Sequence, residues 1–274
     1  MMQIAEGALT GGLPYLAFGS GPPLVMLSGL EAENANPTGW ARASEARGLR
    51  GYARRFRVHV VRRPPGRPRG HDHGRPGGPA RGRARGRSGE AVDVHGTSTG
   101  GSVALQLAVD HPGAVRRLVL QSAACRLSDG GRAAQRRFAA RAAAGEYTRG
   151  VVELAPVMAA TAPGALAVGA LLRATGPSMA PKDPTDLLRT IEAEDMFDVS
   201  DRLGAVRAPT LVVAGAHDGF YSPELFRRTA GGVPEGRLLL YPRMGHMGPT
   251  LSRRVRADVL RFLAGAPVGA APPS

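Results

Sequence analysis

The segment from Ala91 to Val109 changes character at one glycine-rich turn, and this change restricts the folds open to the chain. Residues 91–95 are mostly apolar and β-branched, a pattern typical of a buried strand. Residues 102–109 favour a helix, which Pro112 brings to an end. Between them, residues 96–101 read Gly-Thr-Ser-Thr-Gly-Gly. A strand that turns sharply into a helix is the first part of a βαβ unit, so this segment predicts a parallel sheet.

The same alternation continues on both sides of one helical stretch. Short apolar runs predict strands at 24–27, 56–61, 91–95, 117–120, 210–214 and 237–241. Helical patterns occupy 223–229 and 253–263, and alanine-rich helical patterns replace strand patterns after residue 125. The predicted class is therefore α/β, with a doubly wound, mostly parallel sheet. We expect the core at 1–125 and 196–265, a helical cap at 126–195, and a disordered tail at 266–274.

One segment, residues 62–88, fits none of these elements. It contains nine Arg, seven Gly and five Pro, and its one acid is Asp72. A crossover helix is expected at this point of the fold. Each internal Gly costs a helix about 1 kcal/mol and each Pro about 3 kcal/mol relative to Ala, so this composition cannot form one. Without this segment the formal net charge falls from +14 to +6, so the basic character of the chain is largely local.

Three interpretations of the Arg/Gly/Pro-rich segment stay open. The first is a disordered basic loop, and the second is a nucleic-acid-binding arm. The third is a stretch of the gene read out of frame between two compensating frame changes. Arginines bind phosphates, but no aromatic residue is interleaved with them for base stacking, so nucleic acid is the weaker partner. The third interpretation is favoured, because GC-rich DNA read out of frame yields Arg, Gly, Pro and Ala, and the regular pattern resumes on both sides.

Composition excludes some classes of protein. Cys125 is the single cysteine, so neither an internal disulfide nor a cysteine metal cluster can form. Residues 1–7 have no basic run, and no stretch of about 18 apolar residues could span a membrane. We therefore expect a cytoplasmic protein with no membrane partner, and the sequence leaves its oligomeric state open.

Ser98 is the strongest candidate for chemistry. It lies at the centre of the turn, in the pattern Gly96-x-Ser98-x-Gly100. A strand, a sharp turn and a helix can present a serine hydroxyl as a nucleophile, provided that the residues two positions to either side are small. Gly96 and Gly100 meet that requirement. The positive end of the following helix favours negative charge developing beside the serine.

Three stretches resemble the serine hydrolase branch of the α/β-hydrolase superfamily. The first is Val92 to Val119, which contains the glycine-rich turn. Ala208 to Asp218 resembles the strand end that carries the family's acid, and Tyr241 to His246 resembles its histidine loop. The resemblance covers about residues 13–61 and 90–265. It implies the α/β-hydrolase fold, catalysis without a cofactor, and the chain order nucleophile, acid, base.

A serine hydroxyl is a weak nucleophile at neutral pH and needs a base that an acid orients. His246 is the expected base, because it follows a strand in a glycine-flanked loop. Asp218 is the expected acid, because it follows the strand at 210–214 and leaves room for a helix and a strand before His246. Asp198 and Asp201, just before that strand, are the rival acids.

The tetrahedral intermediate of such a reaction needs two hydrogen-bond donors. The resemblance implies the backbone N–H of Thr99 and that of Leu30, in the loop after the strand at 24–27. Many relatives have His-Gly where this chain has Ser28-Gly29, which leaves a backbone donor unaffected. Many relatives also have an Asp and paired glycines after the next strand, where this chain has Arg62 to Gly66. That departure makes the structure of this loop an open question.

Together these features predict a serine hydrolase that cleaves a small-molecule, ester-like substrate through an acyl-enzyme. Amide, thioester, lactone and carbon–carbon bond hydrolysis stay open. Four apolar residues of the helical stretch would suit an apolar acyl group: Met158, Leu171, Leu172 and Met196. The alternatives are a catalytically inactive hydrolase-like binding protein and a nucleic-acid binder that uses residues 62–88.

Overall fold

The computed structural model describes residues 3–66 and 90–268, and an eight-stranded sheet forms its centre. In sheet order the strands are β1 (Ile4–Leu9), β2 (Leu13–Phe18), β4 (Arg57–Val61), β3 (Pro23–Leu27), β5 (Val92–Thr97), β6 (Val115–Gln121), β7 (Thr210–Gly215) and β8 (Gly236–Tyr241). The pairs β1–β2 and β2–β4 are antiparallel, and the remaining neighbours are parallel. The predicted doubly wound, mostly parallel sheet is confirmed.

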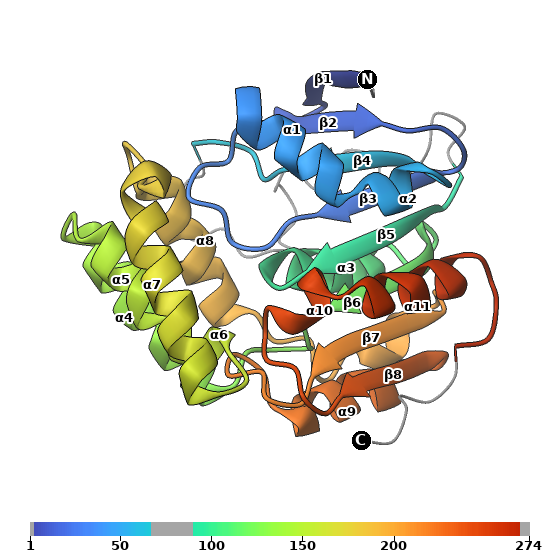
Figure 1. The fold of residues 1–274 in the computed structure, drawn as a ribbon. Helices are drawn as coiled ribbons and strands as arrows, with labels where there is room; N and C mark the ends of the chain where they lie inside the picture. Colours follow the sequence, from blue (N-terminus) through green and yellow to red (C-terminus); the bar gives the residue numbers. More distant parts are fainter. Residues whose placement is uncertain (1–2, 67–89, 269–274) are drawn as a thin grey trace.

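Helices cover both faces of this sheet (Figure 1). On one face lie α1 (Gly39–Gly48), α2 (Arg50–Ala53) and α11 (Arg253–Leu263), and on the other lie α3 (Thr99–Asp110) and α9 (Pro223–Gly232). Each face has its own apolar core, because alternate residues of a strand point to opposite sides. The helix α11 shows the principle from its sequence, since Val255, Val259 and Phe262 recur on one buried stripe.

Helices α4 to α8 all lie between β6 and β7 in the sequence. Their bounds are α4 (Asp129–Ala143), α5 (Tyr147–Glu153), α6 (Ala155–Met158), α7 (Ala162–Met179) and α8 (Thr185–Met196). Figure 1 shows them gathered beside the carboxyl ends of the parallel strands. That edge is where ligands bind in open α/β sheets, so the helices lie over the expected site. No helix in the described ranges is long and apolar enough to cross a lipid bilayer.

The N-terminal hairpin of β1 and β2 has no counterpart among the predicted strands, the first of which begins at residue 24. Five of the six residues of β1 are exposed, so this edge strand lacks the alternation of apolar and polar residues that predicts a half-buried strand. The helix α1 was also not predicted. It buries Ala46 alone, and it therefore shows little amphipathic pattern.

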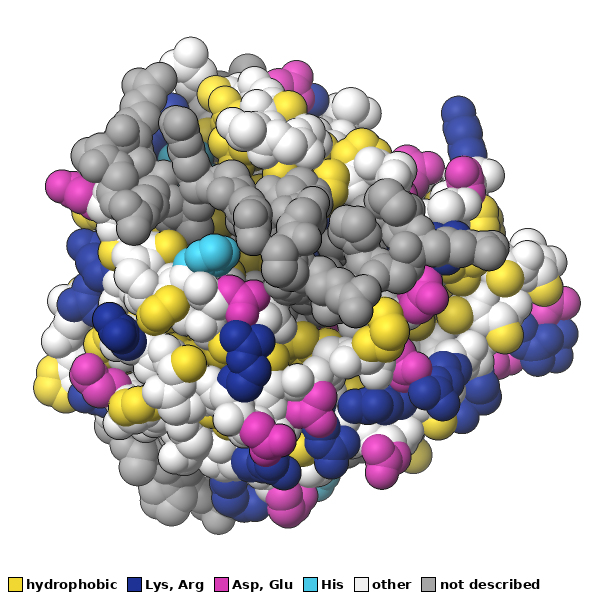
Figure 2. All heavy atoms as spheres, turned by 180° about the vertical axis from the view of Figure 1, so that it is seen from behind, with side chains coloured by type: hydrophobic (Ala, Val, Ile, Leu, Met, Phe, Trp, Pro, Cys, Tyr) yellow, Lys and Arg dark blue, Asp and Glu magenta, His cyan; other side chains and the backbone are white. Residues whose placement is uncertain are grey.

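The charged side chains on the described surface are mixed in sign. Figure 2 shows basic and acidic side chains interspersed on the face opposite to that of Figure 1. Arg136 pairs with Asp195 and Arg202 pairs with Asp110, each at 2.7 Å. Most of the Arg/Gly/Pro-rich segment, residues 67–88, and the end of the predicted tail, 269–274, lie outside the described residues.

Candidate active site

The glycine-rich turn at 96–101 brings Ser98, the predicted nucleophile, to the carboxyl end of β5, at the start of α3. Ser98 adopts φ 52° and ψ −127°, in the left-handed region that non-glycine residues rarely occupy. Its N–H donates to Gln121 O at 2.9 Å, which ties the turn to the neighbouring strand. A Cβ on Gly96 would lie 2.6 Å from Gly101 Cα, and one on Gly100 would overlap the carbonyl oxygens of Leu27 and Ser28, at the end of β3. The turn therefore needs glycine at both positions.

The structure brings the three predicted catalytic side chains together. Ser98 Oγ lies 3.1 Å from His246 Nε2, and Asp218 Oδ2 lies 2.8 Å from His246 Nδ1. An ionised carboxylate can only accept, so Nδ1 carries the proton and Nε2 is left to accept from the serine hydroxyl. Asp218 and His246 are both buried. The arrangement can transfer a proton from the serine to the imidazole while the carboxylate stabilises the resulting charge.

The loop after β7 fixes the acid and the ring. The second carboxylate oxygen of Asp218 accepts from the N–H groups of Phe220 and Tyr221, at 2.9 and 3.2 Å. The Phe220 ring lies 4.6 Å from the His246 ring, and the Tyr221 ring is stacked against it at 6.2 Å between centroids. These contacts leave the imidazole little freedom to rotate, which favours one hydrogen-bonded geometry.

A buried polar cluster beside the loop that carries Asp218, here called the acid loop, was not predicted from the sequence. Glu194, near the end of α8, accepts from Ser102 Oγ at 2.8 Å and from Tyr221 Oη at 3.2 Å. Burial raises the pKa of the Tyr221 phenol well above its usual value, and the negative charges of Glu194 and Asp218 raise it further. The cluster links α8, α3 and the acid loop. Its members are distant in the sequence, so no local pattern marks them.

Ser122 fixes the backbone of the histidine loop and was also missed. It follows β6 with φ 49°, again in the left-handed region. Its hydroxyl donates to His246 O at 2.9 Å, and its N–H donates to Val213 O at 2.8 Å. A serine with this backbone conformation can bridge two loops that meet only in the folded chain. The neighbouring sequence therefore contains no signal for it.

The rival acids lie elsewhere. Asp198 pairs with Arg126 at 3.8 Å, and Asp201 is almost fully exposed and faces Arg228 at 3.5 Å. Of the other histidines, His95 is buried within β5 on the face that packs against Tyr52. The geometry therefore selects Asp218 and His246 from among the described candidates.

Thr99, one expected oxyanion donor, directly follows Ser98, and Leu30, the other, follows a glycine that lies close to Ser98. Thr99 is the first residue of α3, so its N–H has no acceptor within the helix. Leu30 belongs to the loop that follows β3, and the preceding Gly29 approaches the nucleophile closely. A Cβ on Gly29 would lie 3.4 Å from Ser98 Cβ and 4.0 Å from Ser98 Oγ.

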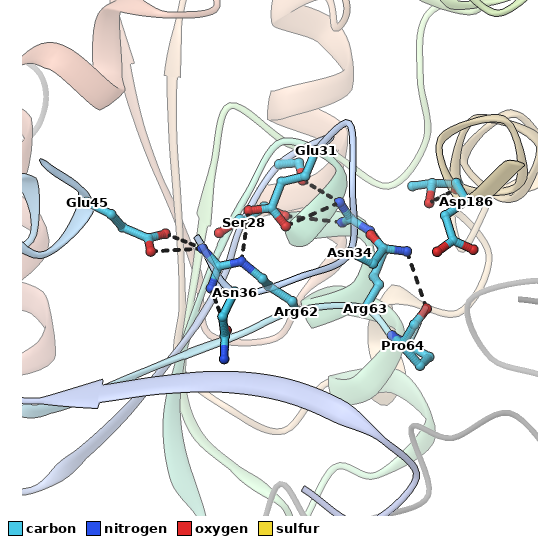
Figure 3. Close-up of polar contacts among 11 residues, drawn as sticks. Ser28, Glu31, Asn34, Asn36, Glu45, Arg62, Arg63, Pro64 and Asp186 are labelled. Carbon is cyan, nitrogen blue, oxygen red and sulfur yellow. Dashed lines mark hydrogen bonds and ion pairs between the residues drawn. The ribbon is translucent and has the colours of Figure 1, made fainter. Parts of the chain in front are cut away.

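Arg62 and Arg63 stand where many relatives have an Asp and glycines, and their side chains make buried polar contacts (Figure 3). These contacts show how the loop is held. Arg62 Nη2 donates to both carboxylate oxygens of Glu45 at 2.8 Å, and its Nη1 donates to Asn36 Oδ1 at 3.3 Å. Arg63 donates to two backbone carbonyls of the loop after β3. Burial raises the pKa of the nearby Glu31, although the positive charges of Arg63 and Arg62 oppose this rise. Residues 62–66 therefore form an ordered loop.

The segment around α6, within the predicted cap, contacts the loops that carry Asp218 and His246. Gly219 donates to Val157 O at 3.1 Å, and Met247 donates to Met158 O at 3.3 Å, so the segment around α6 rests on both the acid and the histidine loops. A cavity of about 750 Å³ lies between α5, α6 and α7, lined mainly by small apolar residues and by Arg173. None of the four apolar residues proposed from the sequence lines it. Leu171 and Met196 are largely exposed.

No group of three or more metal-ligating side chains occurs within residues 3–66 and 90–268. The site's polar atoms are instead engaged with one another, as the distances between Ser98, His246 and Asp218 show. This donor set suits proton transfer and acyl chemistry.

The fold and this arrangement at the carboxyl edge of the sheet define a class: the chain is a hydrolase of the α/β-hydrolase superfamily. Residues 83–248 match the family model described as serine aminopeptidase, S33, and the chain belongs to that family.

Solved structures share the fold along nearly the whole chain. An enol-lactonase from Burkholderia xenovorans is 18% identical with a TM-score of 0.74, over 95% of this chain and 100% of its own. A meta-cleavage product hydrolase from Pseudomonas fluorescens is 17% identical with a TM-score of 0.69, over 96% and 98%. A thermophilic esterase from Thermogutta terrifontis is 20% identical with a TM-score of 0.67, over 96% and 98%. At these identities the likeness concerns the fold.

Proposed function

We propose that this protein is a serine hydrolase that cleaves a small-molecule carboxylic ester through an acyl-enzyme. The observation that carries the proposal is the pair of distances from His246, 3.1 Å to Ser98 Oγ and 2.8 Å to Asp218 Oδ2. Three side chains from separate loops meet at the carboxyl edge of the sheet with the spacing that nucleophilic catalysis requires.

In the first half of the reaction, Ser98 Oγ attacks the substrate carbonyl carbon while His246 Nε2 takes the serine proton. The negative charge on the carbonyl oxygen is stabilised by the N–H groups of Thr99 and Leu30. The tetrahedral intermediate collapses, the bond to the leaving group breaks, and His246 returns the proton to the leaving oxygen. An alcohol departs and the acyl group stays on Ser98.

In the second half, water replaces the alcohol. His246 takes a proton from the water as its oxygen attacks the acyl carbon, and the proton then returns to Ser98 Oγ as the carboxylic acid leaves. Asp218 stabilises the imidazolium in both halves. Esters are the leading substrates because the leaving oxygen of an ester, protonated by His246, departs more readily than the nitrogen of an amide. Amides and thioesters would follow the same steps.

Labelling with a fluorophosphonate probe tests the nucleophile. The folded wild-type protein should be labelled, and Ser98→Ala should abolish the labelling, because the probe phosphonylates an activated serine hydroxyl. Ser178→Ala, on the exposed surface of α7, is the matched control and should label like the wild type. Absence of Ser98-dependent labelling in folded protein would overturn the proposal and favour a catalytically inactive, hydrolase-like binding protein.

Hydrolysis of p-nitrophenyl esters tests the acid. Asp218→Asn should lower kcat/KM by about 10³- to 10⁴-fold, because the amide stabilises the wrong tautomer of the imidazole. Asp198→Asn removes the rival carboxylate and should leave kcat/KM close to that of the wild type. A larger loss in Asp198→Asn than in Asp218→Asn would show that the acid is Asp198 and not Asp218.

A further inference from the structure

Arg63 makes a contact that the proposed reaction does not yet use. It follows β4, its side chain is buried, and its guanidinium reaches the loop after β3. Nη2 donates to Gly29 O at 2.7 Å and Nη1 donates to Ser28 O at 3.3 Å. A charged donor at this distance makes a strong hydrogen bond to a carbonyl. Arg63 therefore holds two successive peptide groups of this loop.

The Gly29 carbonyl belongs to the same peptide group as the Leu30 N–H. No cis peptide bond occurs among the described residues, so this group is trans and planar, and its N–H points opposite to its C=O. In the sheet, β3 lies between β4 and β5. Arg63 follows β4 and Ser98 follows β5, so they lie on opposite sides of the loop that follows β3. A carbonyl held toward Arg63 directs the Leu30 N–H toward Ser98.

We propose that Arg63 is a positioning residue of the oxyanion hole: by holding the Gly29 carbonyl, it orients the Leu30 N–H toward the oxyanion that forms on Ser98. The inference rests on the proposed function and assigns one residue to it. Arg63 acts through the peptide group and touches no reacting atom.

The surrounding charges explain how two adjacent arginines can be buried here. Glu31 lies 3.4 Å from Arg62 Nε and 4.0 Å from Arg63 Nη2, and Glu45 forms a bidentate pair with Arg62. Figure 3 shows the two arginine side chains diverging, one toward Glu45 and the other toward Glu31. Glu31 is the residue directly after Leu30. Glu31 therefore offsets the positive charge of both arginines, whereas the hydrogen bonds to the carbonyls before Leu30 come from Arg63.

Arg62 supplies a matched control for Arg63. Both are buried arginines directly after β4 and both face Glu31, but Arg62 donates hydrogen bonds to the side chains of Asn36 and Glu45. A lysine at either position keeps the charge and loses the fork of donors that spans two carbonyls. Arg63→Lys and Arg62→Lys therefore make similar changes in charge and volume, and only the first disturbs the Gly29 carbonyl.

The experiment compares the two variants in ester hydrolysis. Arg63→Lys should lower kcat by about 10- to 100-fold with little change in KM, since a misdirected oxyanion donor acts mainly in the transition state. Arg62→Lys should keep a kcat close to that of the wild type. Binding of an alkyl boronic acid, which mimics the tetrahedral intermediate, should weaken in Arg63→Lys in parallel with kcat/KM. Binding of the carboxylate product should not.

Two outcomes would overturn the inference. One is an equal loss of kcat in Arg62→Lys and Arg63→Lys, which would show a general effect of the charged loop. The other is that Arg63→Lys and Arg63→Gln both fail to fold while Arg62→Lys folds, which would make Arg63 a purely structural residue. Each is distinct from failure of the proposed function, in which the wild type itself shows no Ser98-dependent labelling.

Discussion

The glycine-rich turn at 96–101, which we call the elbow, and the loop at 28–31 meet beside Ser98, yet different kinds of residue hold them. The elbow depends on the absence of side chains: its glycines let the backbone of α3 approach the carbonyls at the end of β3. The loop at 28–31 is instead held by side chains from elsewhere in the chain: Arg63 donates to two of its backbone carbonyls, and Arg62 faces the Glu31 carboxylate. The glycines of the elbow are close to Ser98 in the sequence, whereas the arginines that hold the loop are distant from it in the sequence.

This difference decides how each segment responds to change. A glycine in close contact tolerates no larger side chain, because backbone atoms cannot move aside cheaply. A buried arginine needs its partners, because a charge left without them in the interior is costly. The elbow should therefore be sensitive to added atoms, and the loop should be sensitive to the loss of charged donors.

The largest expected effect is at Gly100, where the two segments touch. A methyl group there would overlap both Leu27 O and Ser28 O, so Gly100→Ala should destabilise the protein by about 3 kcal/mol or more. Gly113→Ala is the control, since a Cβ at Gly113 meets nothing within 4 Å, and its stability should stay within about 1 kcal/mol of the wild type. Urea unfolding measures both. Equal midpoints for the two variants would mean that the elbow does not pack against the loop.

A smaller effect is expected at Gly29, on the loop side of the same contact. A Cβ at Gly29 would lie 3.4 Å from Ser98 Cβ and 3.5 Å from Thr97 O, which is ordinary van der Waals contact. Gly29→Ala should fold with a stability close to that of the wild type. Its methyl group would stand beside Ser98 Oγ, so the rate of fluorophosphonate labelling should fall by up to about 100-fold. A variant that unfolds like Gly100→Ala would erase the contrast between the two segments.

The same contrast explains what the sequence could reveal. The elbow was predicted from a few neighbouring residues, because the glycines at 96 and 100 serve a turn that is local in the chain. Asp218 and His246 could be proposed as the partners of Ser98 because each lies in the loop after a strand, and parallel strands end at the same edge of the sheet. In both cases the order of strands, turns and helices along the sequence is enough to predict where the side chain lies.

The Arg62–Arg63 loop shows the opposite case. Arg63 contacts Gly29, 34 residues away, and Arg62 contacts Glu45, 17 residues away. Nothing near Arg63 marks it as buried, and a pair of arginines more often lies on the surface. Ser122 and Glu194 were missed for the same reason, since their partners come together only when the fold is complete. The edge strand β1 was missed because it buries too little surface to leave a pattern.

Acid should affect the two segments with opposite sign. The elbow is mounted on β5, where burial lowers the pKa of His95 to about 4 from an ordinary value of 6.5. The unfolded chain then binds a proton at higher pH than the folded chain does. The free energy of unfolding should therefore fall as pH decreases from about 6.5 toward 4, by about 2 kcal/mol between about pH 7.5 and pH 5. His95→Gln should flatten this dependence, as measured by urea unfolding across that range, and an unchanged slope would contradict it.

Glu31 should act in the other direction and more weakly. Burial is the main cause that raises its pKa above the ordinary value, and Arg63 and Arg62 offset part of that rise. The folded protein then binds this proton more tightly than the unfolded chain does, so Glu31 adds stability as pH falls through its raised pKa. Glu31→Gln removes that gain and should make the acid-dependent loss of stability steeper than in the wild type, whereas His95→Gln makes it shallower. If both variants changed the pH dependence of the unfolding free energy in the same direction, the protonation of Glu31 and of His95 would be coupled. The loop and the elbow would then not respond to acid independently.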